Sequence, residues 1–177
     1  MERKKTKKIM VGSVAIGGDA PISVKSMTNT ITKNIDNTIM QILDLERAGC
    51  HIVRAAITDM DDAKAIEKIK KNTNIPFIAD IQYDYKLAIA AVEKGADCLR
   101  INPGNIGERN RVKELINVCK ERKVPIRIGV NSGSIKREYL EKYNGVNENS
   151  MVYSALEHIR LLEDMGYTDM KISLKAR

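Results

Sequence analysis

Short apolar segments alternate with helical patterns along this sequence, and this alternation restricts its fold more than any other feature. Strands that alternate with helices are joined in parallel, and the helices then cover the sheet. The sequence therefore predicts an α/β fold with a parallel sheet. We expect strands over residues 9–11, 14–16, 22–27, 52–57, 77–81, 98–101, 126–130 and 170–174, and helices over residues 36–48, 61–71, 85–94, 109–122 and 149–165.

The first two expected strands are separated only by Gly12-Ser13, which predicts a hairpin that closes the bottom of the larger structure. The later units share a local signature, in which a glycine that ends a helix lies five positions before a cation of the next strand. No linker interrupts the 177 residues, so we expect one domain over residues 1–177. The signature occurs at Gly49 and Arg54, at Gly95 and Arg100, and at Gly166 and Lys171.

Polar residues recur at alternate positions of the expected strands. Side chains of a strand alternate between its two faces, so residues two positions apart share a face. If the polar faces point into a barrel, cations and amides of several strands meet at the carboxyl-end rim, where (β/α)8 enzymes hold their active sites. The pairs that share a face are Arg54 with Ala56, Asp80 with Gln82, Arg100 with Asn102, Arg127 with Asn131, and Ser173 with Lys175.

The cations have two explanations. Each one alone could pair with a carboxylate of a neighbouring element. Burying four cations together, however, requires compensating negative charge, which a diphosphate would supply through paired guanidinium contacts. The cations in question are Arg54, Arg100, Arg127 and Lys175.

The turn after Arg100 has the composition of an anion-binding loop. We expect Asn102-Pro103-Gly104-Asn105 to continue neither flanking element, because Pro103 lacks an N–H group and glycine adopts backbone angles closed to other residues. A loop rich in glycine and amide side chains, ahead of a helix N-terminus, suits an anion.

Composition narrows the class of partner. Lysine and arginine number 30 against 23 aspartate and glutamate residues, and the net charge of +7 favours nucleic acid, phosphate or a diphosphate ester. Trp is absent and Phe occurs once, so the core must be aliphatic. The odd number of cysteines and the lack of CxxC spacing argue against a disulfide framework or a zinc site. We expect Cys50, Cys98 and Cys119 to be buried thiols in a reducing, cytoplasmic compartment.

A membrane role and secretion are not expected. No apolar run approaches the roughly 18 residues of a membrane helix. The basic residues 2–8 are followed by no apolar segment of a secretory signal, and we expect them to form a solvated tail.

Five segments resemble the successive loop motifs of a known family, 4-hydroxy-3-methylbut-2-enyl diphosphate synthase of the methylerythritol phosphate route to isoprenoids. The resemblance covers essentially the whole chain in the family's order, and the segments that begin at Arg100 and Arg127 are long and specific. The segments are residues 24–30 (VKSMTNT), 79–85 (ADIQYDY), 100–107 (RINPGNIG), 127–134 (RIGVNSGS) and 172–176 (ISLKA).

The resemblance implies a (β/α)8 TIM barrel, here truncated to about six of eight βα units after the hairpin. That barrel would bind 2-C-methyl-D-erythritol 2,4-cyclodiphosphate by its phosphates, and its task would be binding and orientation rather than acid–base chemistry. Carried over by motif, the diphosphate cations would be Arg54, Arg100, Arg127 and Lys175, the supporting donors Asn102 and Asn131, and Asp80 a polar wall of the pocket.

In the family, a separate C-terminal domain carries a [4Fe-4S] cluster that binds a substrate oxygen, and two electrons from ferredoxin or flavodoxin open the ring. The barrel and the cluster domain of a dimer mate meet over the substrate. This chain ends just after its sixth expected barrel strand, and its cysteines match no cluster-ligand motif. The resemblance thus implies a homodimeric iron–sulfur enzyme of which this piece binds no cluster, holds no catalytic residue and is inactive alone.

Two positions depart from the family pattern, and both stay among the candidate substrate-binding residues. Lys25 stands where Gln is usual and adds a cation, whereas Gln82 stands where His is usual and removes a titratable ring. Neither histidine replaces it, because His51 lies at the base of its strand and His158 in the middle of a helix.

Two other classes of protein stay open. A pterin-binding barrel transferase, similar to dihydropteroate synthase, would need Asp and Asn at strand ends, and Asp80, Asn102 and Asn131 fit it in part. The charge also permits a nucleic-acid-binding module. Few aromatic side chains are available to stack on bases, however, and the cations lie on several strands rather than on one helix, so we expect no nucleic-acid partner.

Overall fold

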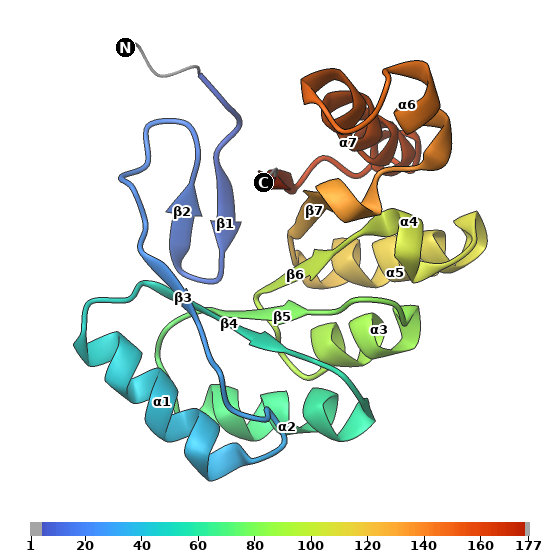
Figure 1. Cartoon of the computed structure of the whole chain (residues 1–177). Helices are drawn as coiled ribbons and strands as arrows, with labels where there is room; N and C mark the ends of the chain where they lie inside the picture. Colours follow the sequence, from blue (N-terminus) through green and yellow to red (C-terminus); the bar gives the residue numbers. More distant parts are fainter. Residues whose placement is uncertain (1–4, 176–177) are drawn as a thin grey trace.

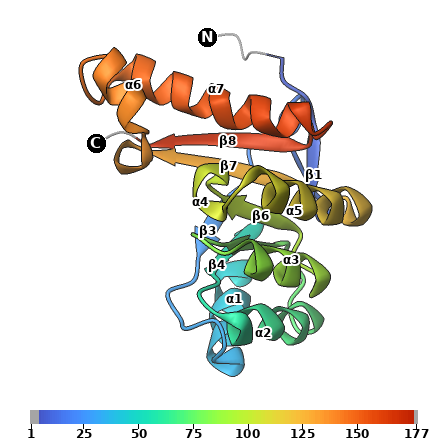
Figure 2. The same ribbon diagram turned by 90° about the vertical axis from the view of Figure 1, so that its right-hand side faces the viewer.

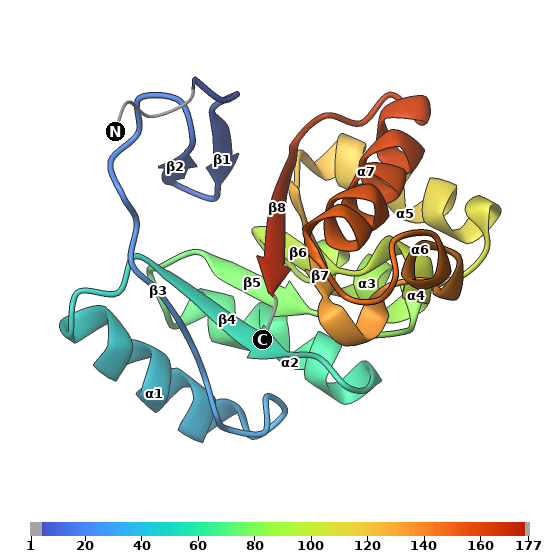
Figure 3. The same ribbon diagram turned by 45° about the horizontal axis from the view of Figure 1, so that its top comes forward.

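A six-stranded parallel sheet forms the centre of the computed structural model, which describes residues 5–175. Its strands follow one another in sequence order, and the sheet curls into an open half-barrel (Figures 1 and 3). This confirms the parallel sheet predicted from the βα alternation and the truncated TIM-type barrel that the family resemblance implied. The strands are β3 (Lys25–Met27), β4 (Ile52–Ala56), β5 (Phe77–Asp80), β6 (Cys98–Ile101), β7 (Ile126–Asn131) and β8 (Met170–Lys175).

The helices between the strands cover the convex face of the sheet (Figure 2). Apolar strand residues that point outward, among them Val53, Phe77 and Leu99, are fully buried against this helical layer. The main core therefore lies between sheet and helices and leaves the concave face for polar side chains. The long helices are α1 (Ile35–Arg47), α2 (Met60–Lys71), α3 (Tyr85–Glu93), α5 (Arg109–Arg122) and α7 (Glu148–Asp164).

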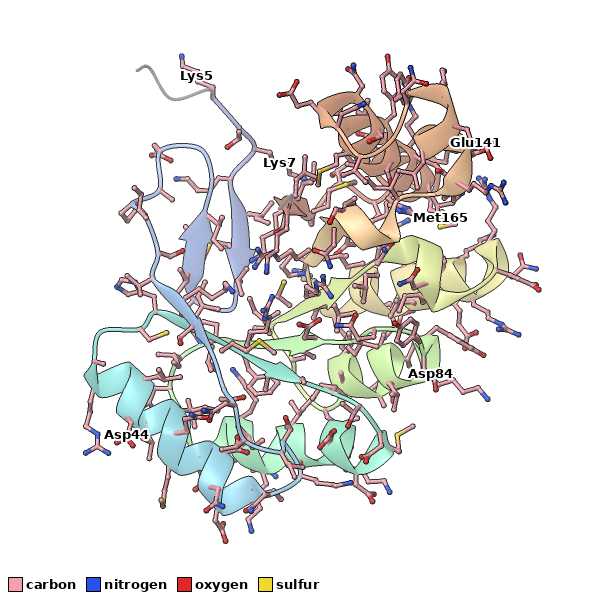
Figure 4. The ribbon with its side chains drawn as sticks, viewed as in Figure 1. Lys5, Lys7, Asp44, Asp84, Glu141 and Met165 are labelled. Atoms are coloured by element: carbon pink, nitrogen blue, oxygen red, sulfur yellow. The ribbon has the colours of Figure 1, made fainter. Side chains whose placement is uncertain are left out.

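The predicted hairpin is present and closes the bottom of the half-barrel. It consists of β1 (Ile9–Val11) and β2 (Val14–Ile16), which pair antiparallel. Val11 packs with Ile52, Ile78 and Cys98, the inward-facing residues at the amino ends of their strands, in a small second core. Lys7, labelled in Figure 4, places its Nζ 2.6 Å from Oδ1 of Asp169 and so ties the segment before the hairpin to the turn before β8.

Local sequence signals set most element boundaries. The side chain of Asp59 accepts hydrogen bonds from two N–H groups of the first turn of α2, and Asp84 caps α3 at the carboxyl end of the sheet (Figure 4). Gly49 and Gly95 end their helices with φ of 88° and 97°, a conformation that strongly favours glycine. None of the helices in residues 5–175 is long and apolar enough to cross a membrane.

The structure differs from the expected elements in three places. Residues 22–24 are not in β3, because they lie beyond the end of its only partner strand, and Ile22 is 80% exposed. Residues after Asn102 do not form only a turn but one helical turn, α4 (Pro103–Ile106), since proline suits the first helical position, where its missing N–H has no partner to lose. The stretch before α7 contains a short 3-10 turn, η1 (Ser132–Ser134), and the unexpected helix α6 (Arg137–Lys142).

Candidate functional site

The strand register places basic residues side by side on the concave face. Arg100 of β6 pairs with Asp80 of β5 on one side and with Arg127 of β7 on the other, and Arg127 in turn pairs with Lys171 of β8. Directly paired residues of parallel strands point to the same face. Since Ile78, on the face of Asp80, packs against the hairpin inside the half-barrel, this whole row points inward.

Asp80 is the carboxylate around which the middle of the row is organised. Its Oδ1 lies 3.1 Å from Nη1 of Arg100, and its Oδ2 lies 3.5 Å from Nε of Arg54. Nε2 of Gln82 donates a third, longer hydrogen bond of 3.3 Å to Oδ1. Asp80 and Arg100 are both buried, so the paired charges hold each other in fixed orientations.

Arg127 lies next to this group but is held differently. Its Nη2 donates a 2.9 Å hydrogen bond to the hydroxyl of Ser173, and within residues 5–175 no carboxylate forms an ion pair with it. Burial lowers the pKa of the Arg127 guanidinium, and the nearby charges of Arg54 and Arg100 lower it further. Arg127 is therefore a half-buried cation that forms no ion pair with a carboxylate of the described residues.

Lysines extend the positive surface on both sides of Arg127. Burial, followed by the charges of Arg54, Arg127, Lys175 and Lys171, lowers the pKa of Lys25 to about 8. Charges of β8 thus act on a residue of β3, the strand at the opposite edge of the half-barrel. Burial also lowers the pKa of the Lys171 amine, and Arg127 adds to that shift.

At the carboxyl-end rim, a cavity of about 270 Å³ opens beside Arg100. Asn102, which follows β6, is buried, whereas Asn131, at the end of β7, is exposed. The Asn131 N–H donates a 3.0 Å hydrogen bond to Oγ of Ser134, which fixes the start of η1 against the cavity. The lining is mostly uncharged and polar, and includes Gln82, Tyr83, Arg100, Asn102, Asn105, Gly129, Asn131 and Ser134.

The structure thus brings the residues singled out from the sequence onto one concave surface, in two parts. We call the first part the cation face: Lys25, Arg54, Asp80, Arg127, Lys171 and Lys175. The second is the amide pocket at the rim, where Gln82, Asn102 and Asn131 lie. Arg100 belongs to both, because its side chain pairs with Asp80 and lines the pocket.

Sequence reasoning missed one member of the site, Lys171, and one neighbour of it, Met27. Lys171 was recognised as a strand cation but not as a site residue, although it shares a face with Ser173 and Lys175. Met27 was not singled out, and its Sδ lies 3.0 Å from Nη2 of Arg54 at the rim of β3. Strand parity could have found Lys171, whereas a methionine near an arginine leaves no signal in the sequence.

Other chemically interesting residues lie away from this surface. The Nδ1 of His51 accepts a hydrogen bond from the N–H of Val24 at the base of the sheet, and His158 is buried in α7. All three cysteines are free and buried, as predicted, and burial raises the pKa of the Cys98 thiol to about 11. Within residues 5–175, no three His, Cys, Asp or Glu side chains gather as metal ligands.

Comparison with known proteins agrees with this geometry. The sequence model of one family, the GcpE TIM-barrel domain, matches residues 6–177. The chain belongs to this family. Two curated relatives are named 4-hydroxy-3-methylbut-2-en-1-yl diphosphate synthase (flavodoxin), one from Clostridium perfringens at 50% identity and one from Nitratiruptor at 54%, both over 176 residues. These findings confirm the family resemblance drawn from the loop motifs.

The alignments cover 99% of this chain but only 50% and 49% of the two relatives. The chain therefore spans about half the length of the curated relatives it matches.

Solved structures with a similar fold are far more distant in sequence. Dihydropteroate synthase from Yersinia pestis superposes with a TM-score of 0.67 at 11% identity, covering 93% of this chain and 61% of that one. A truncated 3-deoxy-D-arabino-heptulosonate 7-phosphate synthase from Thermotoga maritima gives 0.65, also at 11% identity, covering 97% and 58%. At such identities the likeness concerns the fold alone.

Proposed function

We propose that this chain is the substrate-binding barrel portion of a 4-hydroxy-3-methylbut-2-enyl diphosphate synthase and binds 2-C-methyl-D-erythritol 2,4-cyclodiphosphate. The observation that carries the proposal is the imbalance of charge on the concave surface. Among the described residues, Asp80 forms ion pairs with Arg54 and Arg100, and none is formed by Lys25, Arg127, Lys171 or Lys175. A compact dianion of two linked phosphates would supply the missing negative charge.

The two parts of the site suggest two tasks. The cation face would hold the phosphates, with Arg127 and the lysines contributing charge that no described carboxylate offsets. Asp80 would keep Arg54 and Arg100 in place between binding events. The amide pocket, through Asn102 and Asn131, would offer neutral polar groups to the ring and its hydroxyl groups. The barrel would then bind and orient the substrate, which lowers the entropic contribution to the reaction barrier.

The iron–sulfur cluster of the family would supply the two electrons for reductive ring opening. The described residues do not fit such a cluster, because Cys50, Cys98 and Cys119 are buried and no metal-ligand group forms. We therefore place the cluster in the part of the family enzyme that this chain does not cover, and expect this piece alone to bind substrate without converting it. The relatives' names favour flavodoxin over ferredoxin as the electron donor.

The edges of the sheet indicate that the chain associates with another protein chain. Both edge strands of the half-barrel, β3 and β8, have one unpaired side, and Ile172 and Leu174 of β8 are 48% and 44% exposed. Unpaired strand edges with exposed apolar side chains favour association. We propose a cytoplasmic homodimer for the whole enzyme, in which a partner's cluster domain covers the concave surface.

A second candidate rests on the fold. The dihydropteroate synthases superpose well, but their 11% and 14% identities contrast with about 50% for the diphosphate synthases. Isothermal titration calorimetry separates the two functions. We expect the cyclodiphosphate to bind and a pterin to neither bind nor compete. Binding of the pterin, or no binding of the cyclodiphosphate at low salt, would reject the proposed function.

A further inference from the structure

Gly129 leaves room for one side of the Arg100 guanidinium. It lies on the inward face of β7 between Arg127 and Asn131, and it lines the amide pocket together with Arg100. A β-carbon at Gly129 would lie 2.6 Å from Nε, 2.7 Å from Nη2 and 2.9 Å from Cζ of Arg100. Nonbonded carbon contacts are normally about 3.5 Å or longer, so a side chain at this position would require the Arg100 guanidinium to move.

The position of the excluded methyl group is informative. Nε and Nη2 form the two-donor edge of a guanidinium, the edge that binds a carboxylate or phosphate through two parallel hydrogen bonds. The excluded β-carbon lies at hydrogen-bond distance from both nitrogens, whereas Nη1, on the other side, pairs with Asp80. The Nε–Nη2 edge of Arg100 therefore lies directly against the Gly129 backbone, and a side chain at position 129 would push this edge away from β7.

Arg100 cannot move away from position 129 without losing its present orientation. Its Nη1 lies 3.1 Å from Asp80, and its side chain is 10% exposed, so displacement by about 1 Å would break this ion pair or push the guanidinium into the pocket. The atoms that clash are at the end of a flexible side chain. An alanine at position 129 would thus disturb the orientation of Arg100 more than the stability of the fold.

We propose that Gly129 is a positioning residue: because it has no side chain, the Arg100 guanidinium lies against β7, held at Nη1 by Asp80, in the orientation in which Arg100 contacts an anion in the pocket. This inference rests on the proposed function for the identity of the anion, but the packing of Gly129 against Arg100 does not depend on it.

The test combines binding with a double-mutant cycle. Gly129→Ala, Arg100→Ala and the double variant are titrated with the cyclodiphosphate and with inorganic pyrophosphate. We expect Gly129→Ala to weaken binding about tenfold or more, similar to Arg100→Ala, because a charge-assisted pair is lost. In the Arg100→Ala background the alanine should have no further effect. Arg47→Ala is the control, since Arg47 lies on α1 with a side chain that is 76% exposed, outside both parts of the site, and it should bind within about twofold of the parent.

A ligand-free measurement separates this inference from the proposed function. The Nε–H resonance of Arg100, identified in a ¹H–¹⁵N spectrum by its absence in Arg100→Lys, should move in Gly129→Ala and stay in place in Arg47→Ala. If the parent binds neither probe, the proposed function fails, and this spectrum still decides the packing. An unmoved resonance, parent-like binding by Gly129→Ala, or a further loss of affinity in the double variant would each overturn the assignment.

Discussion

Arg100 and Arg127 lie directly opposite each other on adjacent parallel strands, but within the described residues only Arg100 has a carboxylate partner. Two like charges at paired positions of a sheet repel each other. The arrangement is unfavourable for the ligand-free protein and favourable once an anion binds between them. Residues kept for binding at the expense of stability are expected at functional sites.

Replacing Arg127 should therefore separate binding from stability. We expect Arg127→Ala to weaken diphosphate binding about tenfold or more, because a partly buried cation is removed. The same change should leave the urea midpoint of the ligand-free protein unchanged or raise it, since the repulsion by Arg54 and Arg100 disappears. Calorimetry and urea unfolding measure the two effects.

Arg47→Ala serves as the control for this variant. Arg47 lies on α1, its side chain is 76% exposed, and it pairs only with Asp44 of the same helix among the described residues. Its loss should change neither affinity nor midpoint. A large drop in the midpoint of Arg127→Ala would mean that Arg127 is a structural residue and would contradict its assignment to binding.

Asp80→Asn should have the opposite profile. Removal of the carboxylate leaves Arg54 and Arg100 buried without compensation, and we expect a loss of about 3 kcal/mol in the free energy of unfolding, as is typical when one partner of a buried pair is removed. Added pyrophosphate should recover part of this loss, because the anion takes over the compensating role. Urea unfolding with and without pyrophosphate tests both points.

The exposed ion pair between Lys8 and Asp19 provides the comparison for Asp80. Asp19→Asn should leave the midpoint nearly unchanged, because exposed pairs contribute little to stability. If Asp80→Asn were equally harmless, Asp80 would not be the organising carboxylate of the cation face.

Much of the site could be predicted because strands impose a period of two. The positions of Arg54, Asp80, Arg100 and Arg127 on one face follow from that period once the strands are located, and the helix-ending glycines locate them. The contact between Gly129 and Arg100 could not be predicted. It depends on the side-chain path of Arg100 across a neighbouring strand, and sequence patterns do not specify such a path.

The hairpin should be a strong contributor to stability through its contact with the inward-facing base of the sheet. Ile78 is fully buried in the small core that it forms with Val11, Ile52 and Cys98. We expect Ile78→Ala to lower the free energy of unfolding by about 2 to 4 kcal/mol, from lost burial and the cavity left behind. Ile172→Ala, at a 48% exposed position of β8, should change it by less than about 1 kcal/mol. If urea unfolding gave the same loss for Ile78→Ala and Ile172→Ala, the packing of the hairpin against the base of the sheet would not contribute to stability as described.

Lys25 should make anion binding depend on pH in the mildly alkaline range. Its pKa is lowered to about 8 by burial and by four neighbouring cations, so its amine is mostly charged at pH 7 and mostly neutral at pH 9.5. An anion binds the charged form more tightly, and the affinity should therefore fall as the pH rises through about 8. Lys25→Gln, which replaces the amine by a neutral amide, should bind more weakly at pH 7 and lose this fall. Calorimetric titration of the parent and of Lys25→Gln with pyrophosphate, from pH 7 to 9.5, measures how the affinity changes with pH.

The same lysine gives a stability prediction of definite sign. Because the folded-state pKa lies below that of the unfolded chain, the unfolded state binds more protons between about pH 8 and 10.5, and this group makes the ligand-free protein more stable as the pH rises through that range. The penalty of the charged amine is fully present below pH 8. Lys25→Gln should thus raise the urea midpoint at pH 7, with an advantage that shrinks toward pH 10. If the urea midpoints of the parent and Lys25→Gln differ by the same amount from pH 7 to pH 10, the pKa of Lys25 is not lowered, and the charges of the opposite strand do not act on it as described.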